Sequence, residues 1–524
     1  MKLAHIHRIA LWPLLILLGV TWSFAQSSLP KGIDEYVERA RQVFEVPGIS
    51  LAVVKDGKVL LAKGYGVRKL GEAAAVDSKT LFGIASNTKA FTATALGLLV
   101  EEGKLEWDAP VNRYLPWFQL SDPYVTRELT IRDLLVHRSG LGLGAGDLLW
   151  WPPSTYDRKE VARRLRYIPL ATSFRSAYAY DNVLYTVAGE VIEAISGMPW
   201  EDFVKSRILT KVGMTGSNVR HSDAASGRNV ATPHASIEGK IRPCNPFASD
   251  NTNPAGGINS SAEDMAKWMI VQLDSGRVSD GTALFTPRLT TQLWQLVTPI
   301  PIGTQQAELR TLRPNFRGYA LGFDVLDYAG KKMVTHTGGL PGYVSRVTMI
   351  PELKLGVVVL TNQESSEAFN AITYRILDHY LGNPVANWIQ AYRTVRARND
   401  SLLEVRNQRA RGARDSTSHP SLALEKYAGT YTDVWYGDIL ITMDQGRLVI
   451  SFSKTPSLIG DLTHWQYDTF IARWRDRELR ADAFVTFSLN PDGTIEQAKM
   501  RAVSPATDFS FDFHHLLLKP KQEK

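Results

Sequence analysis

The sequence predicts an α+β fold: an antiparallel sheet flanked by helices, with an α-helical subdomain, followed by a small all-β barrel at the C-terminus. Hairpin patterns lie near both ends of the first 382 residues, and the segment between them, residues 86–300, carries mostly helical and loop patterns. From about residue 421 the chain changes to short runs of alternating apolar and polar residues. Its 524 residues are enough for two or three domains.

The first predicted elements are a helix and a hairpin. Apolar side chains recur at helical spacing over residues 33–44. Residues 49–54 and 58–62 read as two short strands. The pair Asp56-Gly57 between them supplies the positive φ that a tight hairpin turn requires, so these strands are expected to pair.

A second hairpin pattern appears near residue 360. Residues 344–350 and 356–361 read as strands, and an amphipathic helix is expected over about residues 365–381. We therefore expect one antiparallel sheet, built from both ends of a first domain that spans residues 26–382.

The remaining chain divides into a linker, residues 383–420, and a β domain, residues 421–524. The linker is polar and Arg-rich and contains a helical segment. A solvated helix explains its basic residues, and contact with an anionic envelope surface is the alternative. Runs such as 439–443 and 483–487 are bounded by turn residues, so the last domain is expected to be a barrel or a sandwich.

The N-terminus reads as a signal peptide over residues 1–25. Lys2 and Arg8 form a basic region, residues 9–22 an apolar region, and residues 23–25 a small-x-small cleavage site. An uncleaved anchor is the alternative, but the apolar run is short for a span of about 20 residues. No second long apolar run follows. We therefore expect an exported protein, periplasmic or secreted, with no integral membrane span after cleavage.

Charge and cysteine content exclude several classes of protein. The net charge of +7 falls to +5 without the signal peptide, and no basic stripe with interleaved aromatic residues indicates a nucleic-acid partner. Cys244 is the only cysteine, so no internal disulfide can form. The histidines lack metal-ligand spacing, and His514 and His515 would face opposite sides of a strand. We expect neither a metal nor a cofactor.

One Ser-x-x-Lys motif opens a long apolar helical run. Lys89 lies three residues after Ser86, so the two side chains share a helix face with Cβ atoms about 5–6 Å apart. A base must take the serine proton before the hydroxyl can attack, and a lysine kept neutral by burial can act as that base. The copies at 28–31 and 451–454 lie beside a proline and in a strand pattern. The alternative for Ser86 is an ordinary helix N-cap with a solvated lysine.

Two further clusters complete a set of three motifs. Tyr180-Asp181-Asn182 precedes an apolar helical segment, and by itself reads equally well as a loop capped by asparagine. His336-Thr337-Gly338 follows a predicted strand, and by itself reads equally well as a hairpin turn.

Taken in this order, the three motifs resemble those of the serine β-lactamase and penicillin-binding protein superfamily. The pattern is closest to the class C β-lactamase-related serine hydrolases, in particular their esterase and D-aminopeptidase branches. Segments 134–141, 254–265 and 319–323 add to the resemblance, which runs from about residue 31 to residue 382. It implies a serine β-lactamase-like catalytic domain. Residues 421–524 resemble the lipocalin-like domain appended to some of these hydrolases.

The resemblance also implies roles for individual residues. Ser86 would be the acylated nucleophile, Lys89 its proton partner and Tyr180 a proton shuttle. Backbone N–H groups of Ser86 and Gly339 would form the oxyanion hole. The substrate-binding residues would be Asn182, His336, Thr337 and Gly338. A phenol acts as a base only if nearby positive charge lowers its pKa, and Lys89 is the expected source of that charge.

One position departs from the β-lactamase pattern. The third motif usually begins with lysine, a permanent cation suited to a β-lactam carboxylate, whereas a histidine such as His336 is mostly neutral at pH 7 and is often found in the esterase and D-aminopeptidase branches. We therefore expect a serine hydrolase that forms an acyl-enzyme on Ser86 and acts on esters or on small amides and peptides, including those with D-residues.

Two other functions stay open. One is a β-lactamase or a peptidoglycan D,D-carboxypeptidase. The other is a binding or sensor protein that acylates slowly and does not turn over. The expected partners are a small-molecule or peptide substrate and, in a homo-oligomer, further copies of the chain.

Overall fold

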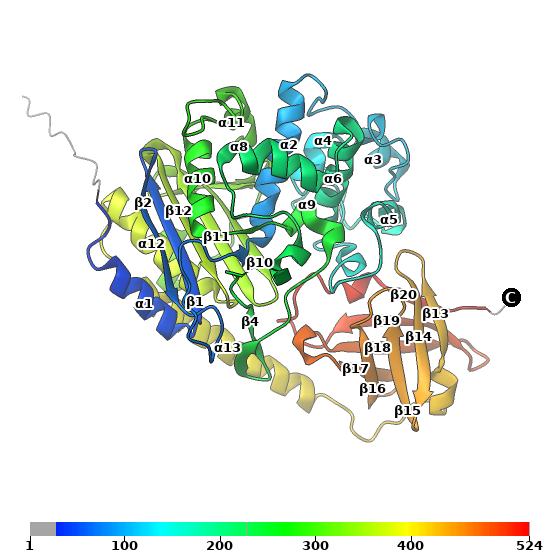
Figure 1. Ribbon diagram of the computed structural model, residues 1–524. Coiled ribbons are helices and arrows are strands. Elements are labelled where there is room, and N and C mark those ends of the chain that lie inside the picture. Colours follow the sequence, from blue (N-terminus) through cyan, green and yellow to red (C-terminus); the bar gives the residue numbers. More distant parts are fainter. Residues whose placement is uncertain (1–27, 227, 523–524) are drawn as a thin grey trace, which may run out of the picture.

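The computed structural model describes residues 28–226 and 228–522 (Figure 1). The predicted signal peptide, residues 1–25, lies outside them. Within the described residues, no helix is both long and apolar enough to cross a membrane. The chain folds into an α+β part around an eight-stranded sheet and a closed eight-stranded barrel, so the predicted fold class is confirmed.

The sheet of the α+β part is antiparallel, in the order β2-β1-β12-β11-β10-β9-β8-β7. Its strands are β1 (Gly48–Lys55), β2 (Lys58–Gly66), β7 (Thr298–Pro299), β8 (Arg317–Tyr319), β9 (Asp324–Tyr328), β10 (Lys331–Leu340), β11 (Tyr343–Ile350) and β12 (Leu355–Thr361). Both predicted hairpins form, as β1–β2 and β11–β12. Ile49 lies opposite Thr361, so strands from the two ends of the domain pair as expected.

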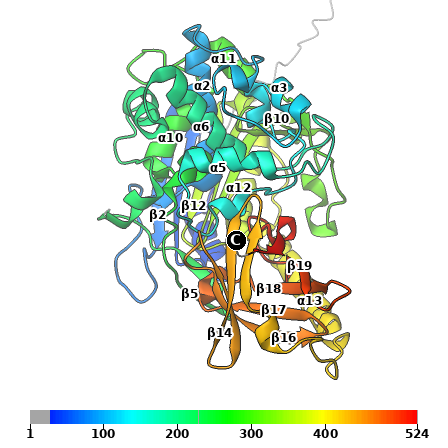
Figure 2. The same cartoon turned by 90° about the vertical axis from the view of Figure 1, so that its right-hand side faces the viewer.

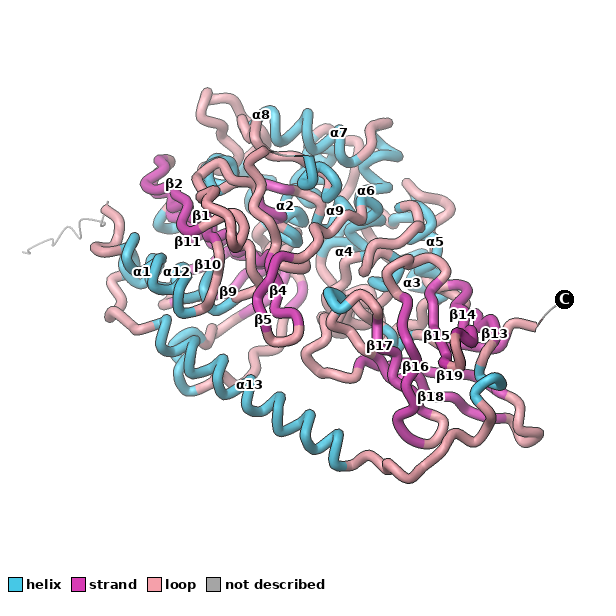
Figure 3. Tube along the Cα trace, turned by 60° about the horizontal axis from the view of Figure 1, so that its bottom comes forward, coloured by secondary structure: helices cyan, strands magenta, loops and turns pink. Residues whose placement is uncertain are grey.

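Helices from the two ends of the domain cover one face of this sheet. They are α1 (Ile33–Val43), α12 (Ser366–Leu381) and the first turns of α13 (Trp388–Gly412). Val37, Phe369 and Trp388 belong to one buried apolar cluster with Leu51 and Val357 of the sheet. Trp388, Ile389 and Tyr392 of the predicted linker therefore join this cluster. The Trp388 ring lies 5.6 Å from that of Tyr374 on α12, and the rest of α13 runs on toward the barrel (Figure 3).

A helical subdomain covers the other face. Its helices are α2 (Thr88–Glu101), α3 (Pro123–Glu128), α4 (Ile131–Leu135), α5 (Arg158–Arg164), α6 (Val183–Ser196), α7 (Trp200–Val204), α8 (Thr210–Val212), α9 (Asn253–Gly256), α10 (Ala262–Leu273) and α11 (Pro287–Leu293). Two small ribbons join it: β3 (Phe82–Gly83) with β6 (Asn259–Ser260), and β4 (His234–Ile237) with β5 (Lys240–Pro243). Residues 88–99 of α2 are buried all round because this helix passes through the core.

Short turns connect these elements. The 3₁₀ turns are η1 (Ala85–Asn87), η2 (Val111–Arg113), η3 (Asp147–Leu149), η4 (Leu165–Tyr167), η6 (His221–Ser226), η7 (Asp250–Thr252), η8 (Ala307–Leu312), η9 (Pro351–Leu353), η10 (Leu424–Tyr427), η11 (Arg477–Leu479) and η12 (Phe513–His515), and η5 (Lys205–Leu209) is a π turn.

The C-terminal domain is a closed antiparallel barrel rather than a sandwich. Its strands are β13 (Gly429–Asp433), β14 (Gly437–Asp444), β15 (Arg447–Phe452), β16 (Ile459–Gln466), β17 (Thr469–Trp474), β18 (Ala483–Leu489), β19 (Ile495–Ala502) and β20 (Leu517–Pro520). The prediction for His514 and His515 was wrong. They lie in the turn η12 before β20, with ring centroids 4.1 Å apart, because the chain bends there before it rejoins the barrel.

The barrel packs directly against the helical subdomain (Figure 2). Arg164, at the end of α5, donates a 2.9 Å hydrogen bond to the Trp435 carbonyl, and the Thr155 N–H donates one of 2.8 Å to the Lys454 carbonyl. Buried side chains of the barrel interior and of the helical subdomain form one continuous apolar cluster. The barrel is therefore held against the first domain by a shared core as well as by the linker.

Candidate active site

The structure brings Ser86 and Lys89 together at the start of α2. Ser86 lies in η1, one turn before the α-helix, and Lys89 in the first turn of α2. Lys89 Nζ lies 2.9 Å from Ser86 Oγ. It also lies 2.8 Å from Asn182 Oδ1 and 2.9 Å from the Ala255 carbonyl oxygen. The amine is thus fixed at hydrogen-bond distance from the serine hydroxyl.

Burial favours the neutral form of the Lys89 amine. Its side chain is fully buried, and this desolvation lowers the pKa of Lys89 to about 7, although the carboxyl groups of Asp147 and Asp181 act in the opposite direction. A substantial fraction of Lys89 is therefore neutral near pH 7. A neutral amine within reach of a hydroxyl can accept its proton.

Tyr180 completes the cluster from the loop that precedes α6. Its ring centroid lies 4.9 Å from Lys89 Nζ. Burial raises the pKa of Tyr180 well above 10, more than the nearby Ser86 hydroxyl lowers it. The expectation that nearby positive charge lowers the pKa of this phenol was wrong, because desolvation of the buried ring is the largest effect and raises the pKa. The phenol stays protonated near pH 7.

Close backbone packing fixes the position of Ser86. Ala85 has a φ of +50°, an uncommon conformation for a non-glycine residue and one that recurs at functional sites. Strand β10 passes so near that a Cβ on Gly338 would lie 2.2 Å from the Ile84 carbonyl oxygen. Gly338 is therefore needed for this approach. The next residue, Gly339, lines the same cavity as Ser86.

His336 is neutral and held from both ring nitrogens. Nδ1 lies 2.6 Å from the Thr337 carbonyl oxygen, which can only accept, so Nδ1 carries the proton. Nε2 then accepts a 2.7 Å hydrogen bond from the Tyr319 hydroxyl. Burial lowers the pKa of His336 to about 3, with the Lys89 charge acting in the same direction. Thr337 is exposed to the cavity.

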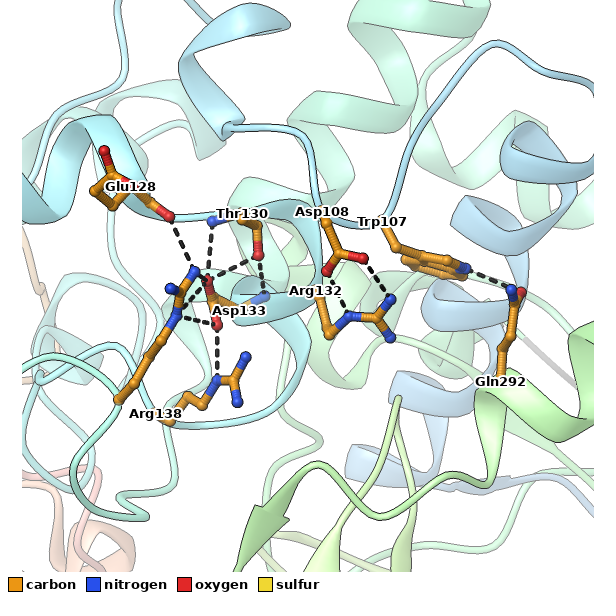
Figure 4. A network of polar contacts seen from close by, with 9 residues as sticks. Trp107, Asp108, Glu128, Thr130, Arg132, Asp133, Arg138 and Gln292 are labelled. Atoms are coloured by element: carbon orange, nitrogen blue, oxygen red, sulfur yellow. Dashed lines mark hydrogen bonds and ion pairs between the residues drawn. The ribbon is translucent and has the colours of Figure 1, made fainter.

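An ion-pair network surrounds the buried Asp133 (Figure 4). Asp133, which is fully buried, accepts a 2.7 Å hydrogen bond from Arg138 and one of 2.6 Å from Arg175. Burial alone would raise the pKa of Asp133, but the hydrogen bonds from Arg175, Thr130 and Arg138 keep it below its usual value. Arg138 directly follows His137, and Arg175 lies five residues before Tyr180. One carboxylate therefore ties together the two segments that hold these residues.

His137 lies next to Arg138 in the sequence and contacts the Tyr180 segment. Its Nδ1 accepts a 3.0 Å hydrogen bond from the Asp181 N–H, and its ring centroid lies 4.2 Å from that of Tyr180. Burial lowers the pKa of His137 well below 6.5, so the ring is neutral. This geometry fits a residue that fixes the loop and does not require a catalytic role for His137.

Asn182 is held between Lys89 and a residue that no motif indicated. Its Oδ1 accepts from Lys89, and its Nδ2 donates a 2.9 Å hydrogen bond to Asp147 Oδ2. Asp147 is fully buried in η3 and also accepts a 2.9 Å hydrogen bond from Trp150 Nε1. Both ends of the Asn182 amide are thus engaged within the protein. The expectation that Asn182 binds a substrate amide stays a prediction.

The cluster of motif residues opens into a cavity of about 670 Å³. Ser86, Tyr180, Asn182, His336, Thr337 and Gly339 all line it, so the motifs separated in sequence converge on one space. Asp508, Phe509 and Ser510 of the C-terminal domain line it as well. The Phe509 ring lies 6.1 Å from that of Tyr180, edge to face. The barrel thus contributes directly to the wall of the site.

Two other kinds of site, a metal centre and a cysteine nucleophile, were also considered. Within residues 28–226 and 228–522, no group of three or more His, Cys, Asp and Glu side chains could hold a metal ion. Cys244 is buried, and this burial raises the pKa of its thiol to about 12. Such a thiol does not form the reactive thiolate that a nucleophile needs.

The chain is similar to known proteins over most of its length. A family model described as Beta-lactamase matches residues 33–381, and one described as a domain of unknown function (DUF3471) matches residues 413–520. The unguisins hydrolase ungD' of Aspergillus campestris is 30% identical over 492 residues, covering 89% of this chain and 88% of that protein. Protein flp of Staphylococcus aureus is 24% identical over 369 residues, covering 69% of each.

A solved structure shares the fold across both domains. The octameric penicillin-binding protein homologue from Pyrococcus abyssi superposes with a TM-score of 0.59 at 22% identity, covering 93% of this chain and 99% of that chain. At this identity the likeness shows the fold alone.

Proposed function

The chain belongs to the Beta-lactamase family, and we propose that it is a serine hydrolase that forms an acyl-enzyme on Ser86. The observation that carries the proposal is the 2.9 Å contact between Ser86 Oγ and a buried Lys89 whose pKa is lowered to about 7. A nucleophile beside a base of this pKa is the arrangement that acyl transfer requires.

In the acylation step, Lys89 Nζ takes the Ser86 proton as Oγ bonds to the substrate carbonyl carbon. The backbone N–H groups of Ser86 and Gly339 stabilise the resulting oxyanion. The bond to the leaving group then breaks. Tyr180 gives its phenolic proton to the leaving group and regains one from the Lys89 ammonium, so the lysine returns to its neutral form.

In the deacylation step, water replaces the leaving group. Its oxygen bonds to the acyl carbon while one water proton passes to the neutral Lys89 Nζ. The Ser86–acyl bond breaks, the proton returns to Ser86 Oγ and a carboxylic acid is released. Asn182 keeps Lys89 in place in both steps through its Oδ1, and Asp147 fixes the orientation of the Asn182 amide.

We place the substrate among esters and small amides or peptides rather than β-lactams. The supporting observation is that the pKa of His336 is lowered to about 3, so the third motif offers no cation to a β-lactam carboxylate at neutral pH. Two fungal relatives are named hydrolases, which supports turnover over the alternative of a sensor that acylates and stops.

Initial rates on three substrates test this function. We would compare a short p-nitrophenyl ester, a D-alanyl anilide and a chromogenic cephalosporin, using residues 26–524 and the Ser86→Ala variant. Ester or anilide turnover that vanishes in Ser86→Ala, with little cephalosporin turnover, is expected. Dominant cephalosporin turnover would make the protein a β-lactamase, and a burst without steady turnover would make it a sensor.

Export and assembly are part of the proposal. The basic, apolar and small-x-small pattern of residues 1–25 supports cleavage and release into the periplasm or medium. N-terminal sequencing of the exported protein should begin at Gln26. An octameric relative of the same fold makes a homo-oligomer worth measuring, and light scattering coupled to size exclusion would give the number of copies.

A further inference from the structure

A second cavity, of about 550 Å³, adjoins the catalytic cavity. Trp151, Gly339 and Asp508 line both, so the two spaces meet beside the catalytic serine. A Cβ on Gly339 would meet no atom within 4 Å, so the strand leaves this junction open. The volume falls within the range of about 300–1,000 Å³ that is typical of small-molecule sites.

The lining of this second cavity is mainly apolar and comes from both domains. Trp151, Phe247 and Leu340 belong to the first domain, and Leu479, Ala506 and Phe511 to the barrel. Trp151 and Phe247 stack with ring centroids 5.0 Å apart. Neither domain alone encloses the space, so the barrel is needed to form it.

The charged groups in the wall already have partners. Glu364 accepts two hydrogen bonds of 2.6 Å from Arg480 and one of 2.8 Å from the Gly342 N–H. Glu478 accepts a 2.9 Å hydrogen bond from the Asn245 N–H. At the junction, Asp508 accepts one of 2.9 Å from the Ser510 N–H. A molecule in this cavity therefore meets mostly apolar surface, and its own apolar groups gain most from binding there.

The position of Tyr180, the proposed proton donor, decides which part of a substrate enters the second cavity. A scissile carbonyl held between Ser86 and Gly339 has two substituents, the acyl group and the leaving group. The leaving group must lie near Tyr180, which protonates it, and Tyr180 lines only the catalytic cavity. The acyl group is then directed past Gly339 toward Leu340, which lines only the second cavity.

We propose that the second cavity is an acyl-group subsite that takes a bulky apolar side chain, aromatic or branched, on the acyl side of the scissile bond. The proposal rests on the function proposed above and narrows its substrate class. The barrel then acts as part of the specificity site, because it supplies one wall of this subsite.

Two p-nitrophenyl esters with the same leaving group test the subsite. One is the acetate and the other the 3-phenylpropanoate, and kcat/KM is measured for residues 26–524 and for Ala506→Trp. Ala506 is exposed at the wall, so tryptophan fills the subsite without displacing core residues. We expect the wild type to favour the phenylpropanoate at least tenfold, and Ala506→Trp to reduce that preference at least tenfold. The matched control is Ala413→Trp, an exposed alanine that lines neither cavity.

A second variant tests the subsite without adding a larger side chain. Leu479→Asn keeps the size of the side chain but makes the wall polar, and Leu402→Asn on the exposed face of α13 is its control. We expect Leu479→Asn to lower the phenylpropanoate preference severalfold, mainly through KM, and Leu402→Asn to leave it unchanged.

The outcomes separate the two proposals. Serine-dependent hydrolysis of the acetate, with no preference for the larger acyl group or with a preference that both wall variants leave intact, would overturn the subsite alone. If Ser86→Ala hydrolyses both esters as fast as the wild type, the proposed function is wrong and the subsite is wrong with it.

Discussion

Ser510 of the C-terminal domain donates a 2.8 Å hydrogen bond to Asp147 in the helical subdomain. Asp147 accepts this bond on the same oxygen that accepts from Asn182, whose other end accepts from Lys89. Two residues on, Asp512 accepts a 2.8 Å hydrogen bond from the Gly146 N–H. The barrel thus reaches Lys89, the proposed catalytic base, through a chain of three hydrogen bonds.

Ser510→Ala removes the first bond of this chain. Loss of one partner of a buried carboxyl group costs about 1–3 kcal/mol, so we expect the free energy of unfolding to fall by about that amount. We also expect kcat for a small ester to fall by about tenfold, because Asp147 and Asn182 are less firmly held. Denaturant unfolding and steady-state kinetics would measure both effects.

Ser510→Thr and Ser488→Ala are the controls for this variant. Threonine keeps the hydroxyl and should restore most of kcat, whereas Ser488 lies on β18 and lines neither cavity, so its loss should leave kcat unchanged. Wild-type kcat in Ser510→Ala would show that the barrel does not position the site.

The pH dependence of acylation should report Lys89. If neutral Lys89 is the base, as proposed, its lowered pKa of about 7 means that kcat/KM should rise with pH and level off above about pH 7. The Asp147 carboxyl raises the pKa of Lys89, so Asp147→Asn should shift the rising part of the kcat/KM profile to lower pH. An unchanged pH profile of kcat/KM in Asp147→Asn would argue against Lys89 as the titrating group.

The same lysine should cost the fold stability. Its pKa is lower in the folded chain, about 7, than the ordinary value of 10.5, so the unfolded chain binds more protons between these values and stability rises with pH there. Lys89→Met should therefore raise Tm most at pH 7 and below, and less at pH 10. It should also abolish ester hydrolysis. Thermal unfolding at several pH values would show whether the gain shrinks as expected.

Gly338→Ala should disturb the strand that faces the nucleophile. The added Cβ would lie 2.2 Å from the Ile84 carbonyl oxygen and 2.7 Å from Ser345 Oγ, so β10 must move away from η1. We expect a loss of about 1–3 kcal/mol in unfolding free energy and a larger proportional loss of kcat/KM. Gly303→Ala is the matched control, because a Cβ there meets no atom within 4 Å. Equal behaviour of the two variants would contradict the packing argument.

His336→Lys tests the proposed preference for esters over β-lactams. The histidine is neutral and accepts from Tyr319, whereas a lysine would place a cation beside the cavity. We expect cephalosporin turnover to rise relative to ester turnover, at least tenfold in the ratio of kcat/KM values. An unchanged ratio would show that this position does not set the preference.

The sequence predicted the parts of the site that short motifs carry. Ser86 and Lys89 are one helical turn apart, and Tyr180 and His336 each belong to a compact motif, so local spacing indicated them. The two hairpins and the barrel were also predictable, because alternating apolar residues and turn residues mark strands independently of tertiary context.

The residues that complete the site could not be found in this way. Asp147 is 35 residues from Asn182 and 363 from Ser510, and no local pattern marks such a hydrogen-bonded chain. The pKa of Tyr180 was predicted in the wrong direction because desolvation depends on burial that the motif does not contain. The same limit explains His514 and His515, where the chain bends instead of continuing as a strand.

The most direct test of the central claim is the mass of the protein trapped during turnover. We would mix residues 26–524 with p-nitrophenyl acetate, quench with acid within the first turnover, and map the modified peptide. One acetyl group on Ser86, absent in Ser86→Ala and more persistent in Tyr180→Phe, is the predicted result. Hydrolysis with no acetyl group on Ser86, or with full activity in Ser86→Ala, would contradict the acyl-enzyme account.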